Sequence, residues 1–284
     1  MAVVRLRSLG DCVLTTPAVH ILKSARPDLR IGMVVEARFR ELFEGNPEIA
    51  EILPPDAAFV RRFAPALCLD FHGGTRSAWI TGLSGAPLRA GFGHFRHRYV
   101  YNVAIPRAQE ILGEERKVHT AEHLASAMFY LGAARCEIPR ARLAAAPAGT
   151  GAPYAVLHPF ATAAAKTWPA ASFAAVAEHL ERSGLRPTIV GGAGDDFAPF
   201  RRWRTVAGAP LGEVKSLLAG ASLFVGNDSG PAHMAAAFGI AVVAVFSASD
   251  PEIWGPWRTA SQVVRAPAST AQVIEALARL QVAA

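Results

Sequence analysis

The segment Asn227–His233 has the residue types of a phosphate-binding turn. It follows a short apolar run, and Asp228 and Ser229 after its first residue are of types that cap helix N-termini. Gly230 permits a bent backbone, and Pro231 suits a first helical turn. A strand that ends in such a turn points backbone N–H groups and the positive end of a helix dipole towards an anion. The alternative is an ordinary helix cap between a core strand and a core helix.

Two further loops carry polar side chains directly after apolar strands. Ser8-Leu9-Gly10-Asp11 follows the first apolar run of the chain, and the carboxylate of Asp11, taken alone, fits a cap of the next helix. A longer polar loop follows the apolar run at residues 154–157 and carries the hydroxyl of Thr162 and the ammonium of Lys166.

Strand and helix patterns alternate along the whole chain, which is typical of parallel sheets covered by helices on both faces. The apolar runs that predict strands are residues 3–6, 31–35, 66–71, 154–157, 187–190, 223–225 and 241–246. The uncharged segment 143–153 is rich in Gly, Ala and Pro and predicts an interdomain linker. We therefore expect two doubly wound α/β domains, residues 1–146 and 147–284, with the last helix packing on either of them.

Ligands of open α/β sheets lie off the carboxyl ends of the strands. The loops that carry Asp11 and Lys166, and the turn at Ser229, are therefore expected at the upper edges of their domains. Two such edges facing each other would form an interdomain cleft. The sequence has no GxGxxG in its first strand-to-helix turn and no GxxxxGK[ST], which disfavours a dinucleotide-binding dehydrogenase and a P-loop NTPase.

Composition describes a globular protein with a basic first half. Of the 284 residues, 51% are hydrophobic and 18% charged, and most of the net charge of +6 lies in residues 1–150. Clusters at Arg61-Arg62 and around Arg96 and Arg98 fit a phosphorylated lipid, a membrane surface or a nucleic acid, or else a solvated basic face. No nucleic-acid-binding module accompanies them, so nucleic acid is not an expected partner. Three widely spaced cysteines and the lack of a secretory signal predict a reducing compartment.

Four segments stand in an informative order along the chain. They are RLRSLGD at residues 5–11, HPFATAAAKTWP at 158–169, GNDSGPAH at 226–233 and DPEIWGP at 250–256. Together they resemble the heptosyltransferases of bacterial lipopolysaccharide core assembly, glycosyltransferase family 9. Residues 69–77 and 89–92 add weaker similarities, and the resemblance spans both expected domains.

This resemblance implies the GT-B fold, in which two Rossmann-like domains flank a cleft. It also implies inverting transfer of heptose from ADP-heptose, held by the second domain, to an anionic Kdo- or heptose-bearing lipid A, held by the first. No metal ion and no cofactor are expected beyond the ADP-sugar substrate. The implied location is cytoplasmic and peripheral, at the inner face of the inner membrane.

The resemblance also assigns roles to individual residues. It places the catalytic base on Asp11, within a substrate-binding loop that includes Ser8 and Gly10. A carboxylate within hydrogen-bond reach of the acceptor hydroxyl can take its proton as that hydroxyl attacks the anomeric carbon. A single displacement forms no glycosyl-enzyme intermediate and so needs no second carboxylate.

The remaining assignments concern the leaving diphosphate. Lys166 matches the family lysine that contacts the diphosphate and supplies positive charge to the leaving group. Thr162 matches a hydroxyl donor. The turn that cradles the diphosphate and donor sugar corresponds to Asp228, Ser229, Gly230 and His233.

The chain departs from the family pattern in two loops that line the nucleotide pocket. Phe160 stands where the family usually has glycine, and Phe246-Ser247-Ala248-Ser249 replaces Phe-Gly-Pro-Thr. Two alternatives therefore accompany the heptosyltransferase prediction. One is a GT-B transferase with another nucleotide-sugar donor, and the other is a catalytically silent protein that binds a nucleotide or a glycolipid.

Overall fold

The chain folds into two compact units. The computed structural model describes residues 1–148, 151–161 and 167–280. Unit 1 is Met1–Ala144 and unit 2 is Ala145–Ala284. The boundary predicted from the sequence, between residues 146 and 147, lies two residues further along the chain.

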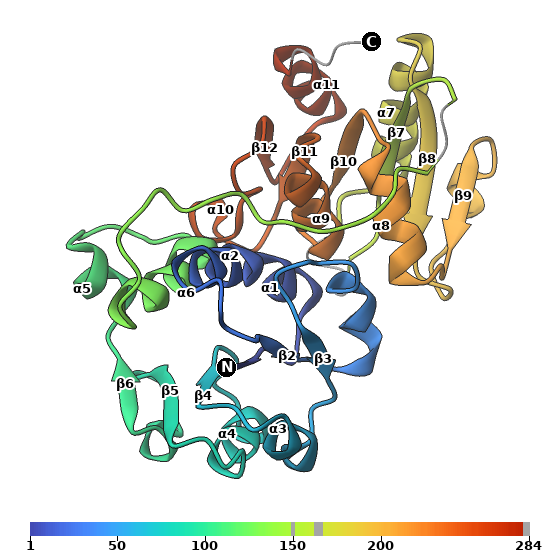
Figure 1. The fold of residues 1–284 in the computed structure, drawn as a ribbon. Helices are drawn as coiled ribbons and strands as arrows, with labels where there is room; N and C mark the ends of the chain where they lie inside the picture. Colours follow the sequence, from blue (N-terminus) through green and yellow to red (C-terminus); the bar gives the residue numbers. More distant parts are fainter. Residues whose placement is uncertain (149–150, 162–166, 281–284) are drawn as a thin grey trace. The chain divides into compact units, whose positions relative to one another are not determined.

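Unit 1 is an alternation of short strands and helices (Figure 1). Its strands are β1 (Ala2–Val4), β2 (Gly32–Val34), β3 (Glu51–Leu53), β4 (Leu67–Asp70), β5 (Leu88–Phe92) and β6 (Val103–Ile105). Its helices are α1 (Leu9–Leu14), α2 (Thr16–Ala25), α3 (Ala57–Phe63), α4 (Thr75–Gly82), α5 (Ala108–Leu112) and α6 (Thr120–Tyr130), with 3-10 turns η1 (Ala37–Leu42) and η2 (Arg98–Val100).

The sheet of unit 1 is wholly parallel. Its strand order is β3-β2-β1-β4-β5-β6, so the order of the strands reverses between β1 and β4. Helices α2 and α6 pack together, as do α3 and α4, and Figure 1 shows these two pairs on opposite faces of the sheet. The carboxyl ends of β1 and β4 therefore lie side by side, at the position where ligands bind in this class of sheet.

Unit 2 repeats this plan. Its strands are β7 (Tyr154–His158), β8 (Arg186–Gly191), β9 (Arg204–Ala207), β10 (Leu223–Asn227), β11 (Ala241–Phe246) and β12 (Ser261–Arg265). Its helices are α7 (Ala170–Arg182), α8 (Leu211–Ala219), α9 (Gly230–Phe238), α10 (Pro251–Trp254) and α11 (Thr270–Arg279), with the 3-10 turn η4 (Ala198–Phe200).

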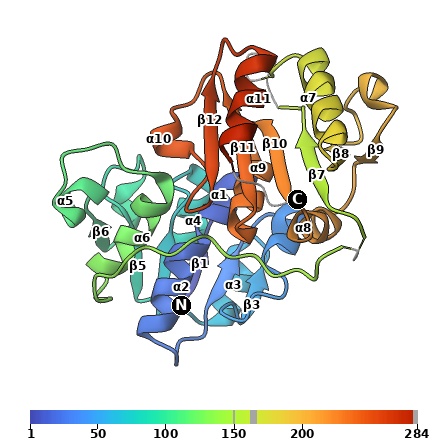
Figure 2. The same ribbon diagram turned by 90° about the horizontal axis from the view of Figure 1, so that it is seen from above.

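The second sheet has the order β12-β11-β10-β7-β8-β9, again all parallel, and its order reverses between β10 and β7. Helix α11 packs on α7, and α8 packs on α9; Figure 2 shows α7 and α11 on one side of the sheet and α8 on the other. The final helix, α11, packs on elements of unit 2.

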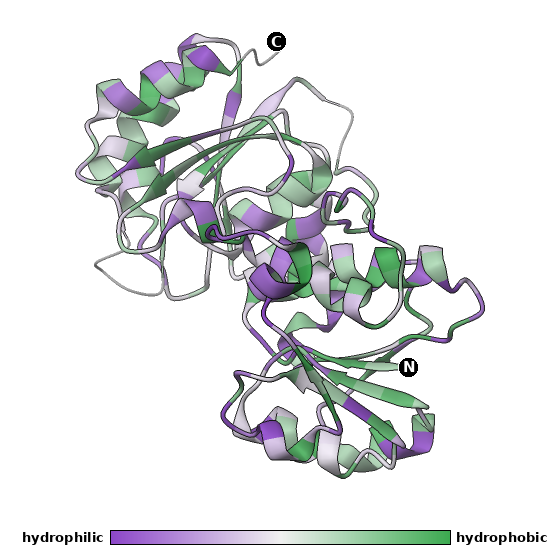
Figure 3. Ribbon diagram, turned by 90° about the vertical axis from the view of Figure 1, so that its left-hand side faces the viewer, coloured by the Kyte–Doolittle hydropathy of each residue, from purple (hydrophilic) through white to green (hydrophobic). Residues whose placement is uncertain are grey.

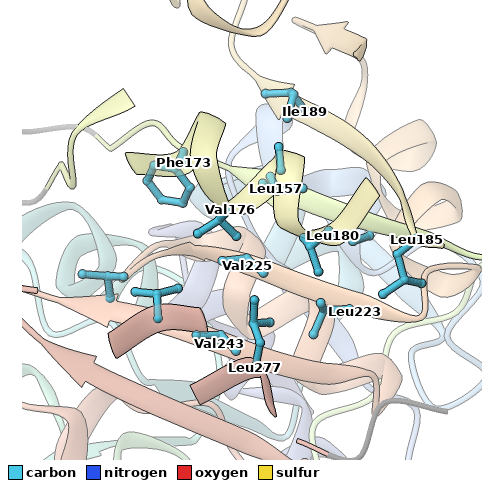
Figure 4. Close-up of a cluster of buried hydrophobic side chains, with 14 of the residues drawn as sticks. Leu157, Phe173, Val176, Leu180, Leu185, Ile189, Leu223, Val225, Val243 and Leu277 are labelled. Carbon is cyan, nitrogen blue, oxygen red and sulfur yellow. The ribbon is translucent and has the colours of Figure 1, made fainter. Parts of the chain in front are cut away.

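Apolar strands build the core of each sheet, and Figure 3 shows the strands of both units as largely hydrophobic. In unit 2, side chains of β7, β8, β10 and β11 meet those of α7 and α11 (Figure 4). Central strands of a parallel sheet are covered on both faces and so read as continuous apolar runs, such as AVVAVF in β11. The seven predicted runs are strands β1, β2, β4, β7, β8, β10 and β11, which confirms the doubly wound α/β class.

Local sequence signals fix the ends of several helices. Asp56 caps α3 by accepting a hydrogen bond from the Ala58 N–H at 2.7 Å. Gly239 ends α9 in the left-handed region, with φ of 77°, which glycine adopts without steric cost. Among the helices within the described residues, none is long and apolar enough to cross a membrane.

Candidate functional site

The candidate site of unit 1 begins where β1 ends. Ser8 is the N-cap of α1, and Asp11 lies in the first turn of that helix, as its capping-box partner. The Asp11 Oδ2 atom accepts hydrogen bonds from Ser8 Oγ at 2.8 Å and from the Ser8 N–H at 3.2 Å. Gly10 is buried within the same helix. The structure therefore brings the three predicted residues of this loop together.

A mostly buried arginine holds the other oxygen of this carboxylate. The Arg5 guanidinium forms an ion pair with Asp11 Oδ1 and also donates a hydrogen bond to the backbone carbonyl of Phe71, which follows β4. The Arg5 and Asp11 side chains are only 11% and 17% exposed. Arg5 thus spans the point where the strand order reverses and fixes a carboxylate at the carboxyl edge of the sheet.

This arrangement has a definite chemical capacity. An ionised carboxylate only accepts hydrogen bonds, and contacts to both of its oxygens fix the orientation of this one. Because the side chain is also partly exposed, it can take a proton from a substrate as a general base must. It also caps a helix, so the cap predicted from residue type and the base implied by the family are compatible uses of Asp11.

The candidate site of unit 2 lies at the equivalent position, where β10 leads into α9. Ser229 is the N-cap of α9, but its hydroxyl makes no capping hydrogen bond and instead lies 3.2 Å from Nδ1 of His158, at the end of β7. No described residue accepts a hydrogen bond from the N–H groups of Ser229 or Gly230. Pro231 follows in the first turn. The helix therefore presents backbone donors at its positive end, which is an anion-binding arrangement.

Asp228 and His233 lie on either side of Ser229 and Gly230 in the chain. The backbone N–H of Asp228 donates to the carbonyl of Val245 at 3.0 Å, and its carboxylate accepts a hydrogen bond from Ser249 Oγ. His233, one turn into α9, is buried, with 6% of its surface exposed. Ser249 thus orients Asp228 from the loop that departs from the family sequence.

His158 does not add charge to this turn at neutral pH. Burial lowers the pKa of His158 to about 4, with Asp195 acting weakly in the opposite direction. The imidazole is therefore neutral and acts on Ser229 through hydrogen bonding alone. Positive charge for an anion in unit 2 must come from the helix N-terminus and from other side chains.

Lys166 and Thr162, the predicted diphosphate contacts, lie outside the described residues. The described residues on either side of them are held by one side chain. Asn227, fully buried at the end of β10, donates from Nδ2 to the carbonyl of Pro159 at 2.9 Å and accepts from the Trp168 N–H at 2.9 Å. Trp168 is buried and donates from its indole to the carbonyl of Ala268.

Phe160, which replaces a family glycine, is accommodated by the core of unit 2. Its ring lies edge-on to Phe197 and Phe200, with centroids 5.0 and 6.1 Å away. It also covers Gly191, where an added Cβ would lie 2.4 Å from the ring. The ring therefore packs against its own unit, opposite a glycine that leaves room for it.

Sequence reasoning missed two of the residues that organise these sites. Arg5 is part of the quoted RLRSLGD motif. A charged residue at the end of a buried strand usually has a hydrogen-bond or ion-pair partner, so the sequence could have indicated that Arg5 is paired. Asn227 ends an otherwise apolar strand and gives the same signal. In both cases the signal marks the residue but does not name its partners.

Two parallel sheets with the same reversing strand order, each with a polar site at the point of reversal, define an α/β protein of the GT-B class. Residues 61–282 match the family described as glycosyltransferase family 9 (heptosyltransferase). The chain belongs to this family and is a glycosyltransferase, so the predicted family and enzyme class are confirmed.

Named relatives are similar over nearly the whole chain. Lipopolysaccharide heptosyltransferase 3 of Escherichia coli strain K12 is 26% identical over 288 residues, which cover 89% of this chain and 83% of that protein. Lipopolysaccharide heptosyltransferase 1 of Pseudomonas aeruginosa is 27% identical over 287 residues, which cover 89% and 80%.

Solved structures show the same fold. A family 9 glycosyltransferase from Veillonella parvula has a TM-score of 0.86 at 20% identity, covering 98% of this chain and 96% of its own. The E. coli heptosyltransferase WaaC, solved with ADP, has a TM-score of 0.83 at 20% identity, covering 98% of both chains. At this identity the comparison establishes the GT-B fold and nothing further.

Proposed function

We propose that this protein transfers heptose from ADP-heptose to an inner-core lipopolysaccharide acceptor with inversion at the anomeric carbon. The observation that carries the proposal is the carboxylate of Asp11. It is held by Arg5 and Ser8 at the ligand edge of unit 1, in a chain that belongs to a heptosyltransferase family. Relatives named for lipopolysaccharide heptosyl transfer match 89% of the chain.

In this proposal unit 1 holds the acceptor and Asp11 is the general base. The acceptor hydroxyl attacks the anomeric carbon, the bond from that carbon to the diphosphate oxygen breaks, and the hydroxyl proton passes to Asp11. The products are the extended acceptor and ADP. Ser8 and Gly10 belong to the loop that contacts the acceptor.

Unit 2 holds the nucleotide-sugar in the same proposal. The N–H groups of Ser229 and Gly230 and the dipole of α9 stabilise the negative charge that grows on the leaving diphosphate. Lys166 adds positive charge and Thr162 a hydroxyl donor, while Asp228 and His233 contact the donor sugar or its phosphates. These sources of positive potential are the reason that the proposal invokes no metal ion and no separate cofactor.

The acceptor is lipid-anchored, so the proposal includes a cytoplasmic enzyme that works at the inner face of the inner membrane. The relatives' names support the lipopolysaccharide acceptor. The basic first half of the chain suits the acceptor's negative charge.

A donor panel tests this function. ADP-heptose, ADP-glucose and UDP-glucose are each incubated with the protein and a Kdo-lipid A acceptor, and the acceptor mass is measured. The proposal expects a gain of one heptose, from ADP-heptose alone. Gain of a hexose would favour a GT-B transferase with another donor. Binding of ADP without turnover of any donor would favour a catalytically silent homologue.

A further inference from the structure

Large apolar side chains are exposed together on one part of unit 1. Of the large hydrophobic residues that are exposed in the described chain, most lie between residues 59 and 99. Trp79 is 64% exposed and Tyr99 is 79% exposed, and Phe59 and Leu83 are close to half exposed. Single exposed apolar residues are ordinary, but a group of them within one surface region marks an interaction site.

Phe59, Trp79 and Tyr99 belong to α3, α4 and η2, and Leu83 directly follows α4; helix α4 packs on both α3 and η2. The Thr75 hydroxyl at the start of α4 lies 3.0 Å from Nε2 of His97, which precedes η2. An added Cβ at Gly82 would lie 3.1 Å from Val100. We call the resulting surface the α3–α4–η2 face; it consists of Phe59, Arg62, Trp79, Leu83, Arg98 and Tyr99.

Helix α4 has an unusual pattern for a surface helix. Its buried positions include Ser77, Ala78, Ile80 and Thr81, whereas Trp79 and Leu83, four residues apart, share the exposed side. The largest apolar side chain of the helix thus points away from the core of its own unit. Packing within unit 1 does not account for it.

The same region is basic. Between residues 57 and 106 the chain has the arginines Arg61, Arg62, Arg76, Arg89, Arg96 and Arg98. The single acidic residue in this stretch, Asp70, is fully buried. Within the described residues no carboxylate pairs with Arg62 or Arg98, and the Arg62 guanidinium lies 5.6 Å from the Phe59 ring centre. Exposed aromatic, aliphatic and cationic groups therefore occur together on α3, α4 and η2.

We propose that the α3–α4–η2 face docks on a bilayer that contains anionic phospholipid. Trp and Tyr side chains favour the interface between lipid and water, and arginines close to a membrane surface are attracted by anionic headgroups. Arg62 and Arg98 place their guanidinium groups at phosphate depth while Phe59, Trp79 and Leu83 enter the acyl boundary. A partner that offered only negative charge would use the arginines but would leave the apolar residues exposed. This inference rests on the proposed function, whose acceptor lies in such a bilayer.

Trp79 supplies a direct probe. Trp168 and Trp203 are buried and Trp254 and Trp257 are half-buried, so Trp79 is the exposed indole of the chain. Vesicles of phosphatidylcholine mixed with phosphatidylglycerol should shift the protein's tryptophan emission to shorter wavelength, and brominated lipid should quench it. Vesicles of phosphatidylcholine alone should do so weakly. The Trp79→Phe variant should bind the mixed vesicles with neither change; an unaltered emission shift in that variant would overturn the proposal.

A variant that removes arginine charges at the proposed face is compared with a control that removes the same number of charges elsewhere. The comparison shows whether the position of the arginines, or only the net charge of the protein, determines vesicle binding. Arg61→Gln/Arg62→Gln/Arg98→Gln removes the two charges of the proposed face and the neighbouring exposed charge of Arg61. The control Arg182→Gln/Arg201→Gln/Arg204→Gln removes three exposed charges from unit 2. Sedimentation with the mixed vesicles should weaken by about fivefold per arginine in the first variant, which is the expected contribution of each charge near an anionic surface. It should change little in the control. Equal weakening in the two variants, or binding of a nucleic acid duplex in place of vesicles, would contradict the proposal.

Failure of docking and failure of the proposed function remain distinguishable. Vesicle binding is measured without any nucleotide-sugar. Transfer is measured separately on a deacylated, water-soluble acceptor. Both charge variants should keep wild-type transfer to the soluble acceptor, while the first loses transfer to acceptor embedded in vesicles. Docking without any transfer would overturn only the function, and transfer without docking would overturn only the docking face.

Discussion

The side-chain carbonyl of Asn227 accepts a hydrogen bond of 2.9 Å from the backbone N–H of Trp168. Because the same amide donates to the carbonyl of Pro159, one fully buried side chain joins the described residues on both sides of residues 162–166 to the end of β10. The strand that leads into the anion-binding turn therefore also anchors Pro159 and Trp168.

Asn227→Ala should destabilise the protein and weaken donor binding together. The substitution leaves a buried carbonyl and a buried N–H without partners, at a cost of about 2–4 kcal/mol in the free energy of unfolding. The anchoring of both ends is lost, so the KM for the nucleotide-sugar should rise. Urea unfolding and steady-state kinetics measure the two effects.

Asn102 offers a matched control for this prediction. Its side chain makes the same pair of bonds, donating to the Pro87 carbonyl and accepting from the Arg89 N–H, each at 2.7 Å, but it is exposed. Water can replace its bonds, so Asn102→Ala should cost less than about 1 kcal/mol. An equal loss of stability in the two variants would argue against the importance of burial at Asn227.

Arg5→Gln should lower kcat while leaving the KM for the donor unchanged. Arg5 contacts Asp11 and the Phe71 carbonyl, both in unit 1, so its removal frees the carboxylate to rotate. Misplacement of a reacting group by about 1 Å costs up to about a hundredfold in rate, and we expect a decrease of roughly 10- to 100-fold.

Two further variants test whether Arg5 acts through Asp11. Arg5→Lys keeps one charge but loses the second contact, so it should recover part of kcat. Ser8→Ala removes a single bond to Asp11 and should have a smaller effect than Arg5→Gln. A rise in donor KM with kcat unchanged in Arg5→Gln would show that Arg5 does not position the base.

The stability of the protein should fall below about pH 6.5 because of two partly buried histidines. Burial lowers the pKa of His158, in unit 2, and of His123, in unit 1, to about 4, from an ordinary value of 6.5. The unfolded chain therefore binds these protons more tightly than the folded protein does. The free energy of unfolding is undiminished above about pH 6.5 and decreases as the pH falls towards 4.

Urea unfolding at pH 7, 6 and 5 measures this dependence, in a range where most carboxylates stay ionised. His158→Gln removes one of the two groups and should flatten the decrease, and His123→Gln should flatten it in the same way. A variant with the wild-type slope would show that its histidine is not held neutral in the folded protein.

The sequence predicted the central strands of both sheets, whose two faces are covered by helices. Strands such as β10 and β11 lie between neighbours on both sides and show as apolar runs. Strands β3, β6, β9 and β12 were not predicted because they lie at sheet edges and carry exposed residues, as in RTVA of β9. Strand β5, next to the edge strand β6, was also missed; it begins with the exposed Leu88 and the half-buried Arg89. Such sequences do not differ clearly from polar loops.

The candidate site was predictable in its residue types and not in its contacts. Asp11 and Ser229 stand at strand-to-helix turns, and that position follows from local sequence. The partners of Arg5 and Asn227 do not, because Phe71, Pro159 and Trp168 lie 59 to 68 residues away along the chain. Only the folded sheet brings those strand ends together.

The most direct test of the central claim compares heptose transfer by the wild-type protein and by Asp11→Asn, using ADP-heptose and a Kdo-lipid A acceptor. Removing a general base costs about 10²–10⁴-fold in rate, so the variant should lose that much kcat while binding ADP-heptose as tightly as the wild type does. The reaction is followed by the gain of one heptose in acceptor mass. Wild-type transfer by Asp11→Asn, or no heptose transfer by either protein, would contradict the account.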